Sequence, residues 1–331
     1  MEPKVTVVVT TLNRLGYLQQ AVASVQTQRD VSLELIVVDN GSTDGTADWL
    51  CSLTEQGVAV LRVEPDLARP RAARIAAARN AGLGPARGEY VWFLDDDDRL
   101  RSGSLALLAS TLDRHPDAVA AVGARTRFGE RVAGGRIAHP LNPMLGDFRR
   151  ELLLGWGFVP SQTLCRAETL RRAGGWNEEA PFAEDLDMWA RMLSLGPVAL
   201  EPETVVEYRV HRSQSRLADP AAGHDLVLRP YATALAGGDR ARGERLRNAG
   251  RWWDRANSAF DRGLPRSALT STTRALVLAP ALVRSPLLRP LSTRLIVRST
   301  LRCWGPTRRW VEARAERPPA ATPRRGAGFL S

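Results

Sequence analysis

Four consecutive aspartates, Asp95 to Asp98, stand directly after the apolar run YVWFL at 90–94. Such a run is typical of a buried β-strand, so the chain passes from the interior of a sheet straight into four carboxylates. Carboxylates held close together repel one another unless a cation lies between them. The alternative is a solvated loop whose last aspartate caps the next helix, and the position after a buried strand favours the cation site.

The first half of the chain alternates strand-like apolar runs with helix-like segments, which is the pattern of a mostly parallel α/β sheet flanked by helices. We predict strands at 4–11, 33–38, 58–63, 90–94 and 118–123. Between them we predict helices at 16–28, 67–83 and 103–114, and one from an N-cap at Ser42 or Thr43 through Leu53. After an irregular stretch at 124–160 come predicted helices at 166–174 and 184–195, strands at 197–200 and 204–209, and helices at 224–237, 241–262 and 265–279.

At 331 residues the chain is long enough for one large domain and a smaller one. Its composition shifts after His211, which indicates a boundary near residue 215. We predict an α/β domain over 1–215, a helical region over 216–312 and a disordered tail, rich in Arg, Pro and Ala, over 313–331.

The net charge is +10, and nearly all of the basic side chains are arginines, because Lys4 is the only lysine. A basic chain suggests an anionic partner such as a nucleotide, a phospholipid surface or a nucleic acid. The scarcity of lysine also fits the coding bias of a GC-rich genome, which leaves a solvated basic surface as the alternative. Because no basic or aromatic module for nucleic acids is present, we expect no nucleic-acid partner.

The cysteines Cys51, Cys165 and Cys303 lie far apart, without a Cys/His cluster, so neither a zinc site nor a disulfide framework is expected. The first residues lack the charged and apolar regions of a signal peptide. No apolar run reaches the roughly 18 residues of a membrane span. We therefore expect a cytoplasmic protein, either free or peripheral at the inner face of the membrane.

Polar residues follow the first, second and fourth predicted strands, as TTLNR at 10–14, DNGSTD at 39–44 and the four aspartates. Ligands of open α/β sheets bind at the carboxyl ends of the strands, so these residues indicate one site. An oxygen-rich site suits Mg²⁺ or Mn²⁺, which can bridge a diphosphate. A second acidic group, FAEDLDMW at 182–189, either caps a helix or supplies a general base.

Five stretches carry a more specific signal: VTVVVTTLNR at 5–14, LELIVVDNGSTDGT at 33–46, AARNAGLGPARGEYVWFLDDDD at 77–98, GGWNEEAPFAEDLDMWARM at 174–192 and YRVH at 208–211. In this order and approximate spacing they resemble a family 2 glycosyltransferase with the GT-A fold, and they cover roughly residues 4–212. The resemblance implies that residues 1–215 form a GT-A nucleotide-sugar domain and that the predicted C-terminal helices are an extension of it.

The resemblance also implies a donor nucleotide site made of these side chains: Thr11, Asn13, Arg14, Asp39, Arg79, Asn80, Asp95 and Asp96. Among them Asp39 would recognise the nucleotide base. Asn40 stands where many members of the family have a second aspartate, which leaves Asp39 intact.

Metal and catalytic residues follow from the same resemblance. Asp95 and Asp97 would form a DXD-like element, with Asp97 as the direct ligand of Mn²⁺ or Mg²⁺ and His211 helping to hold the metal or the diphosphate. Asp185 would be the catalytic base, with Glu184 beside it. The implied reaction is an inverting displacement that transfers a sugar from a nucleotide-diphosphate donor, with UDP or dTDP favoured, to an acceptor hydroxyl.

The acceptor is less well defined by the sequence. Cell-surface polysaccharide, glycolipid and natural-product glycosylation are the settings we expect, with a glycan, a lipid-linked sugar or a small molecule as acceptor. The Q-x-x-R-W element of processive members is missing, which indicates one sugar per event. Trp156 and Trp176 either stack on an acceptor sugar or belong to the core or to an interface.

The C-terminal helices combine many arginines with Trp252, Trp253 and several leucines. They either lie on an anionic membrane or pack on the catalytic domain or at a dimer interface. Two other functions stay open at this point. A nucleotidyltransferase also uses an α/β domain with metal-binding carboxylates, and a non-catalytic relative would only bind nucleotide-sugars.

Overall fold

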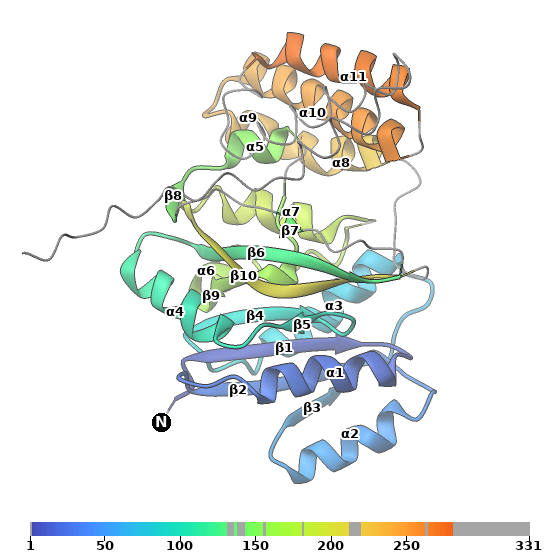
Figure 1. Ribbon diagram of the computed structural model, residues 1–331, viewed down its shortest axis with the longest axis vertical. Coiled ribbons are helices and arrows are strands. Elements are labelled where there is room, and N and C mark those ends of the chain that lie inside the picture. The colour runs from blue at the N-terminus through green and yellow to red at the C-terminus, as the bar shows by residue number, and fades with distance from the viewer. Residues whose placement is uncertain are drawn as a thin grey trace, which may run out of the picture.

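The computed structural model describes residues 2–130, 136–137, 143–154, 157–180, 182–211, 220–261 and 264–280 (Figure 1). Its strands are β1 Val5–Thr11, β2 Leu33–Asp39, β3 Ala59–Arg62, β4 Tyr90–Asp95, β5 Arg99–Leu100, β6 Ala120–Gly129, β7 Arg136–Ile137, β8 Met144–Gly146, β9 Thr163–Arg166 and β10 Val198–Val210. Its α-helices are α1 Leu15–Gln26, α2 Thr46–Glu55, α3 Arg71–Leu83, α4 Ser104–Arg114, α5 Arg149–Leu153, α6 Ala167–Arg172, α7 Glu184–Met192, α8 Pro220–Leu228, α9 Ala232–Leu235, α10 Arg240–Asp261 and α11 Pro265–Leu278. Two short 3₁₀ helices are η1 Pro160–Gln162 and η2 Arg229–Tyr231.

All of these strands join one mixed sheet in the order β3-β2-β1-β4-β9-β6-β10-β5, with β7 on β6 and β8 on β10. The pairings β3–β2–β1–β4 and β6–β10 are parallel, while β9 runs antiparallel between β4 and β6. Parallel pairing in register sets Thr11 beside Asp39 and Thr10 beside Asp95. The carboxyl ends of β1, β2 and β4 therefore meet at one edge of the sheet, as the sequence predicts.

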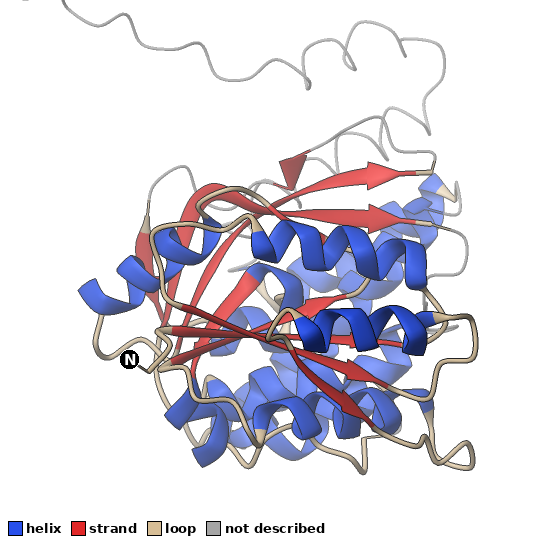
Figure 2. Ribbon diagram, turned by 90° about the horizontal axis from the view of Figure 1, so that it is seen from below, coloured by secondary structure: helices blue, strands red, loops and turns tan. Residues whose placement is uncertain are grey.

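Helices cover both faces of the sheet, because successive side chains of each strand point to opposite sides (Figure 2). Val5, Val7 and Val9 of β1 belong to the hydrophobic cluster that includes the buried faces of α1 and α4. Val8 belongs to the opposite cluster, with α3, α7 and the C-terminal helices. Gly82 of α3 is required there, because a Cβ would collide with the side chain of Val8.

The helices α8 to α11 form a separate layer beyond α5 and α7, at the end of the molecule farthest from β1 to β3 (Figure 1). The helix α10 packs against α11, α8, α9 and α5. Gly250 of α10 allows this close approach, because a Cβ there would collide with the backbone of Leu153 and Leu154. No helix within the described residues is both long enough and apolar enough to cross a membrane.

Several predicted elements need correction. The N-cap prediction at Ser42 or Thr43 is wrong: α2 begins at Thr46 after Gly45, which has φ +85°. The predicted helix at 67–83 begins only at Arg71, after Pro70. The helix predicted at 166–174 is confirmed as the shorter α6, and the strand β9 that directly precedes it at Thr163–Arg166 was not predicted.

In the second half of the chain, the observed secondary structure differs more from the predicted one. The strands predicted at 197–200 and 204–209 are one strand, β10, with a register shift between Leu200 and Thr204. The helix predicted at 224–237 divides into α8, η2 and α9, because Pro230 cannot continue a helix. The predicted domain boundary near 215 and the disordered tail at 313–331 lie outside the described residues.

Candidate active site

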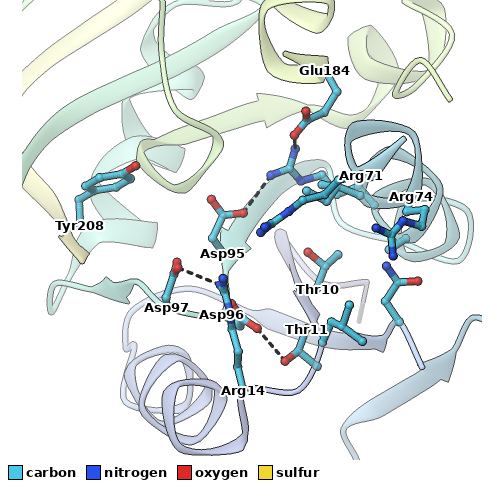
Figure 3. A pocket seen from close by; sticks show the side chains of 15 residues that line it. Thr10, Thr11, Arg14, Arg71, Arg74, Asp95, Asp96, Asp97, Glu184 and Tyr208 are labelled. Carbon is cyan, nitrogen blue, oxygen red and sulfur yellow. Dashed lines mark hydrogen bonds and ion pairs between the residues drawn. The ribbon is translucent and has the colours of Figure 1, made fainter. Parts of the chain in front are cut away.

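A cavity of about 350 Å³ opens at the sheet edge where β1, β2 and β4 end (Figure 3). It is lined by Thr10, Thr11, Leu12, Arg14, Asn40, Arg71, Arg74, Ile75, Ala78, Arg79, Asp95, Asp96, Asp97, Glu184 and Tyr208. These residues come from three strand ends, the loop after β1, α3, the start of α7 and β10. The long parallel pairings align the strand ends, and the polar residues that follow them form one wall.

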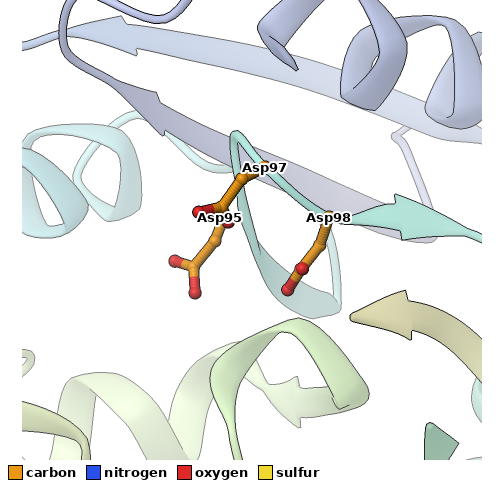
Figure 4. A group of neighbouring side chains, drawn as sticks. All are labelled: Asp95, Asp97 and Asp98. Carbon is orange, nitrogen blue, oxygen red and sulfur yellow. The ribbon is translucent and has the colours of Figure 1, made fainter. Parts of the chain in front are cut away.

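Three carboxylates gather beside this wall. Asp95, Asp97 and Asp98 each offer one oxygen, and these oxygens lie within 4.8 Å of one another (Figure 4). Asp98 Oδ1 accepts the backbone N–H of Arg209 at 2.8 Å, whereas its buried Oδ2 has no hydrogen-bond partner among the described residues. Burial raises the pKa of the Asp98 carboxyl well above its usual range, and the charges of Asp97 and Asp95 raise it further. A set of carboxylate oxygens with one unsatisfied buried member fits a hard divalent cation.

Basic groups balance the same carboxylates. Asp97 Oδ2 accepts a hydrogen bond from Arg14 Nη1 at 2.9 Å, and His211 Nε2 lies 2.8 Å from it. Arg14 Nη1 also donates to Asp96 at 3.0 Å, and Thr11 Oγ1 donates to Asp96 at 2.8 Å. Burial raises the pKa of Asp96 to about 6, although the positive charge of Arg14 opposes this shift. The structure therefore brings these five predicted site residues together.

Arg79 connects the aspartates to the second acidic group. Its buried guanidinium donates to Asp95 Oδ1 at 2.9 Å and to Glu184 Oε1 at 3.1 Å. The guanidinium also lies over the ring of Trp176, 4.3 Å from the ring centroid. A charge held on three sides in this way fixes the distance between β4 and the start of α7.

Glu184 and Asp185 open α7, after Ala183 in the left-handed conformation (φ 51°). Burial raises the pKa of Glu184 to about 7, and Arg79 opposes this shift. Burial also raises the pKa of Asp185, against the positive charges of Arg79 and His224. Glu184 lines the cavity, whereas Asp185 stands behind it and accepts the backbone N–H of Leu186 at 2.8 Å. The acidic group forms the first turn of α7 without a side-chain cap, and its Glu184 reaches the cavity; a general base in this group stays a prediction.

Some predicted donor residues lie outside the cavity wall. Asp39 is buried, where it accepts the Ser42 N–H at 2.9 Å and faces Arg62 Nη1 at 3.4 Å. Asn13 Oδ1 accepts the Thr43 N–H at 2.7 Å, so it ties together the loops after β1 and β2. Asn40, the departure from the family pattern, lines the cavity in place of Asp39.

Asn80 also faces away from the cavity. Its amide donates to the carbonyl of Trp176 at 2.8 Å and to Glu178 at 2.8 Å, and its oxygen accepts the N–H of Trp176 at 2.7 Å. This side chain therefore holds the segment that leads into α7. Asn80 would therefore influence donor binding only indirectly, by holding that segment in position.

The prediction that Trp176 stacks on an acceptor sugar needs correction. The ring is only 4 % exposed, because it packs edge-on against Phe93 and under Arg79. Trp176 therefore belongs to the hydrophobic core, which was the alternative interpretation. Trp156, the other predicted acceptor residue, lies outside the described residues.

Four residues of the site could not be assigned a role from the sequence. Arg71 and Arg74 line the cavity from the first turn of α3, and their spacing of three in an alanine-rich helix was the available signal. Tyr208 lines it from the YRVH stretch, and Asp98 completes the carboxylate group. Asp98 belongs to the four-aspartate run, so only its role was missing.

Comparison with known proteins adds independent information. The model of the Glycosyl transferase family 2 matches residues 6–171. An uncharacterized glycosyltransferase of Haemophilus influenzae is 26 % identical over 226 residues, which are 64 % of this chain and 67 % of that protein. The GalNAc(5)-diNAcBac-PP-undecaprenol β-1,3-glucosyltransferase of Campylobacter jejuni is 39 % identical over 106 residues, about a third of either chain (32 % and 33 %).

Solved structures show the same fold. The TarS 1–349 structure from S. aureus in complex with UDP-GlcNAc superposes with a TM-score of 0.61 at 18 % identity, covering 89 % of both chains. The mannosyltransferase PcManGT from Pyrobaculum calidifontis, in complex with GDP-Man and Mn²⁺, gives 0.50 at 20 % identity, covering 92 % of this chain and 88 % of that one. The family match spans half of the chain and includes β1 to β4 and the aspartate run. The chain therefore belongs to glycosyl transferase family 2 and is a glycosyltransferase with the GT-A fold.

Proposed function

We propose that this enzyme transfers one sugar per event from a nucleotide-diphosphate donor to an acceptor hydroxyl, in a metal-dependent reaction that inverts the anomeric carbon. The observation that carries the proposal is the content of one cavity. A carboxylate group suited to Mn²⁺ or Mg²⁺ lies on one side, and Glu184, the neighbour of Asp185 in α7, lies on the other, joined through Arg79. A leaving group and an attacking hydroxyl need those two kinds of residue on opposite sides of the reacting carbon.

In this proposal Asp97 and Asp95 hold the divalent cation, with His211 at Asp97. The cation would neutralise charge on the departing diphosphate. Asp185 takes the proton from the acceptor hydroxyl as its oxygen forms a bond to C1 of the sugar. The bond from C1 to the diphosphate oxygen breaks, and the nucleoside diphosphate leaves. Arg79 keeps the base and the cation site at a fixed separation through its bonds to Glu184 and Asp95.

UDP or dTDP is the proposed carrier of the donor sugar. TarS, which has the same fold, was solved with UDP-GlcNAc, and this supports a uridine nucleotide. PcManGT was solved with GDP-Man, so a guanine nucleotide belongs in any test. Asn13, Asp39 and Asn80 would act on the nucleotide through the loops and the segment that they hold in place.

For the acceptor we propose a glycan or a lipid-linked sugar, with a small molecule as the alternative. The Campylobacter jejuni relative is named for a sugar carried on undecaprenyl diphosphate, which supports the lipid-linked class. An acceptor of this kind sits at a membrane surface. We therefore also propose that the basic C-terminal helices contact anionic lipid from the cytoplasmic side.

A thermal-shift experiment tests the donor site. UDP, dTDP and GDP are added with and without MnCl₂ to the wild type, to Asp97→Asn and to Asp48→Asn, an aspartate of α2 outside the cavity. A nucleotide at about 100 times its dissociation constant stabilises the fold by about 2.7 kcal/mol. We expect a manganese-dependent shift with one nucleotide in the wild type and in Asp48→Asn, and a loss of this shift in Asp97→Asn. Absence of any shift in the wild type would contradict the proposal.

The products separate this proposal from its alternatives. Incubation with the stabilising nucleotide's sugar conjugates and an acceptor extract should release nucleoside diphosphate. Release of pyrophosphate would indicate a nucleotidyltransferase. Tight binding without release would indicate a non-catalytic relative.

A further inference from the structure

The layer of C-terminal helices brings a titratable side chain close to the acidic pair of α7. The helix α8 packs against α7 on one side and against α10 on the other (Figure 1). His224 of α8 lies with its Nδ1 2.8 Å from Oδ2 of Asp254 in α10, and the Asp254 side chain is only 9 % exposed. A buried carboxylate this close to an imidazole favours the positively charged form of histidine.

His224 and Asp185 influence each other's ionisation. Burial raises the pKa of the Asp185 carboxyl, whereas the positive charges of Arg79 and His224 oppose this increase. Burial lowers the pKa of the His224 imidazole, but the hydrogen bond and charge of Asp254, with the charge of Asp185, outweigh burial and raise it above its ordinary value. The imidazolium of His224 therefore has two carboxylates as electrostatic neighbours, one on α10 and one on α7.

The other charged groups around Asp185 come from the sheet region. Arg79 of α3 is shared, because it is bonded to Asp95 and Glu184, and the charge of Asp95 raises the pKa of Asp185. Arg125 of β6 also interacts electrostatically with Asp185. An arginine keeps its charge at every physiological pH, whereas a histidine gains or loses it near neutrality. Of these three cations, His224 is thus the one that can change its charge within the working range of an enzyme.

The remaining charged groups near His224 have partners of their own. Asp187 of α7 is bonded to Arg191. Asp225 of α8, which lines a small cleft with His224, is surrounded by three basic side chains of η2 and α10: Arg229, Arg247 and Arg251. Asp254 and Asp185 are therefore the carboxylates whose charge stabilises the imidazolium.

We infer that His224, held by Asp254, is a positioning residue for the reaction, because its positive charge keeps Asp185 ionised and able to take the acceptor's proton in neutral and mildly acidic solution. This inference rests on the proposed function, since it needs Asp185 to be the base. A buried carboxyl without such a neighbour stays protonated over more of the pH range and cannot accept a proton. The inference also gives the C-terminal helices a part in the reaction, since α8 and α10 supply both residues.

A histidine NMR titration of the free enzyme tests the interaction without any substrate. The chain has four histidines, and the spectrum of His224→Gln identifies the signal of His224. We expect His224 to titrate at lower pH in Asp185→Asn and in Asp254→Asn than in the wild type, because each substitution removes a negative charge beside the imidazole. The signal of His115, which follows α4 on the opposite face of the sheet, should not move. An unchanged His224 titration in Asp185→Asn would overturn the inference and leave the proposed function standing.

The pH profile of turnover tests the consequence for the reaction. Release of nucleoside diphosphate from the active sugar conjugate of UDP, dTDP or GDP is measured for the wild type, His224→Gln, Asp254→Asn and the control His115→Gln. We expect His224→Gln to be about three- to tenfold slower than the wild type near pH 6 and within about twofold of it near pH 8.5, where the wild-type imidazole has also lost its charge. Asp254→Asn should change the profile in the same direction, and His115→Gln should leave it unchanged.

Two controls separate this role from a purely structural one. Thermal unfolding and nucleotide binding should be near the wild-type values in both variants, because neither residue lines the donor cavity. Asp254→Asn keeps a hydrogen-bond acceptor for the imidazole, so it replaces His224→Gln where the latter does not fold. An equal loss of turnover at every pH would overturn the inference, since His224 would then only join α8 to α10. Wild-type turnover in Asp185→Asn would instead overturn the proposed base, and this inference with it.

Discussion

The two regions of the chain carry opposite net charge. Residues 1–215 contain 24 basic and 28 acidic side chains, a net charge of −4, whereas residues 216–331 contain 22 basic and 8 acidic ones, a net charge of +14. In the sheet region two of the four arginines of the cavity wall, Arg14 and Arg79, are bonded to fixed carboxylates. The excess of +10 is therefore not located at the active site, whose cavity wall has four acidic and four basic side chains. The excess positive charge belongs to the C-terminal region, so we expect an anionic partner to bind there.

The two regions also pack differently. The sheet core is built from large side chains such as Val8, Ile36 and Trp92, which are fully buried. The interface of α10 combines large buried side chains, Leu246 and Trp253, with Gly250, which lies against the backbone of Leu153 and Leu154. The acidic pair of α7 stands where the regions meet, since α7 packs against α3 on one side and α8 on the other. Changes at this junction have the largest expected effects.

Asp185→Asn should lower turnover by about 10²–10⁴-fold, because a general base contributes acceleration of that order. Nucleotide affinity should stay near the wild-type value, since Asp185 does not line the cavity. Glu184→Gln should lower turnover less, because the amide oxygen can still accept from Arg79. Nucleoside diphosphate release under saturating donor and acceptor measures both variants. Near-normal turnover in Asp185→Asn together with an inactive Glu184→Gln would move the base to Glu184, the carboxylate that lines the cavity.

A change of pH should have opposite effects on turnover and on the stability of the fold at this junction. Burial raises the pKa of Glu184 from 4.5 to about 7 and raises that of Asp185, so both tend to be protonated in mildly acidic solution. A base must be deprotonated, so turnover should fall as the solution becomes mildly acidic, because burial raises the pKa of Asp185. A carboxyl whose pKa is raised by folding stabilises the fold below its ordinary pKa and loses this contribution as pH rises toward 7. Melting temperature should therefore decrease between pH 5 and 7 while turnover increases, as turnover and unfolding curves measured at matched pH would reveal. Parallel rises in both would contradict this account.

The sheet region was far more predictable from sequence than the rest, for physical reasons. β1, β2 and β4 are short apolar runs that end in polar residues, so the continuous apolar run and the change in polarity locate them. β9 escaped prediction because its residues, Thr163–Arg166, run straight into a helix and pair antiparallel with distant strands. Pairing of this kind depends on the tertiary structure and leaves little local signal.

The site shows the same division. The aspartates and the acidic pair of α7 could be predicted because carboxylates in a row are unusual at the end of a buried strand or the start of a helix. Arg71 and Arg74 could not, since an arginine in an alanine-rich helix looks the same whether it faces solvent or a cavity. Only the packing of α3 on the sheet places them in the cavity wall. Trp176 was ambiguous for a related reason, because an aromatic ring suits a core as well as a sugar.

Two glycine substitutions test whether the regions depend on each other. Gly250→Ala should lower the free energy of unfolding by about 1–3 kcal/mol, because its Cβ meets backbone atoms of Leu153 and Leu154, which cannot rotate away. Nucleotide affinity should be retained, since every cavity residue lies between Thr10 and Tyr208. Turnover should fall, because a displaced α8 disturbs η2, whose Tyr231 donates to Asp187 of α7 at 2.7 Å. Chemical denaturation, calorimetry and product release measure the three quantities.

Gly16→Ala is the matched control, because an added Cβ on α1 meets nothing within 4 Å. It should be neutral or slightly stabilising, as alanine is the better helix former. Weakened nucleotide binding in Gly250→Ala, with Gly16→Ala normal, would mean that the helical region shapes the donor cavity. The donor site would then not be independent of the C-terminal helices.

The smallest expected effects concern the basic face of the helical region. Arg255 and Arg274 flank the ring of Trp252 at 5.0 and 4.4 Å, and Val277 of α11 is 74 % exposed. If this face contacts anionic lipid, each arginine should contribute about 1 kcal/mol near the surface. Arg255→Gln and Arg274→Gln should each weaken sedimentation with vesicles rich in phosphatidylglycerol by about fivefold. Arg87→Gln, which removes a charge from the sheet region, should leave it unchanged.

Salt and lipid composition decide how this last result is understood. Binding to a charged surface falls as salt shortens the Debye length to about 3 Å at 1 M, whereas apolar insertion does not. We therefore expect sedimentation to be lost at high salt and on neutral phosphatidylcholine vesicles. Binding that persists under both conditions would assign the contact to Val277 and Trp252 rather than to the arginines. Binding to no vesicle at all would leave the charge of +14 as a solvated surface, and the opposite charges of the two regions would carry no information about the acceptor.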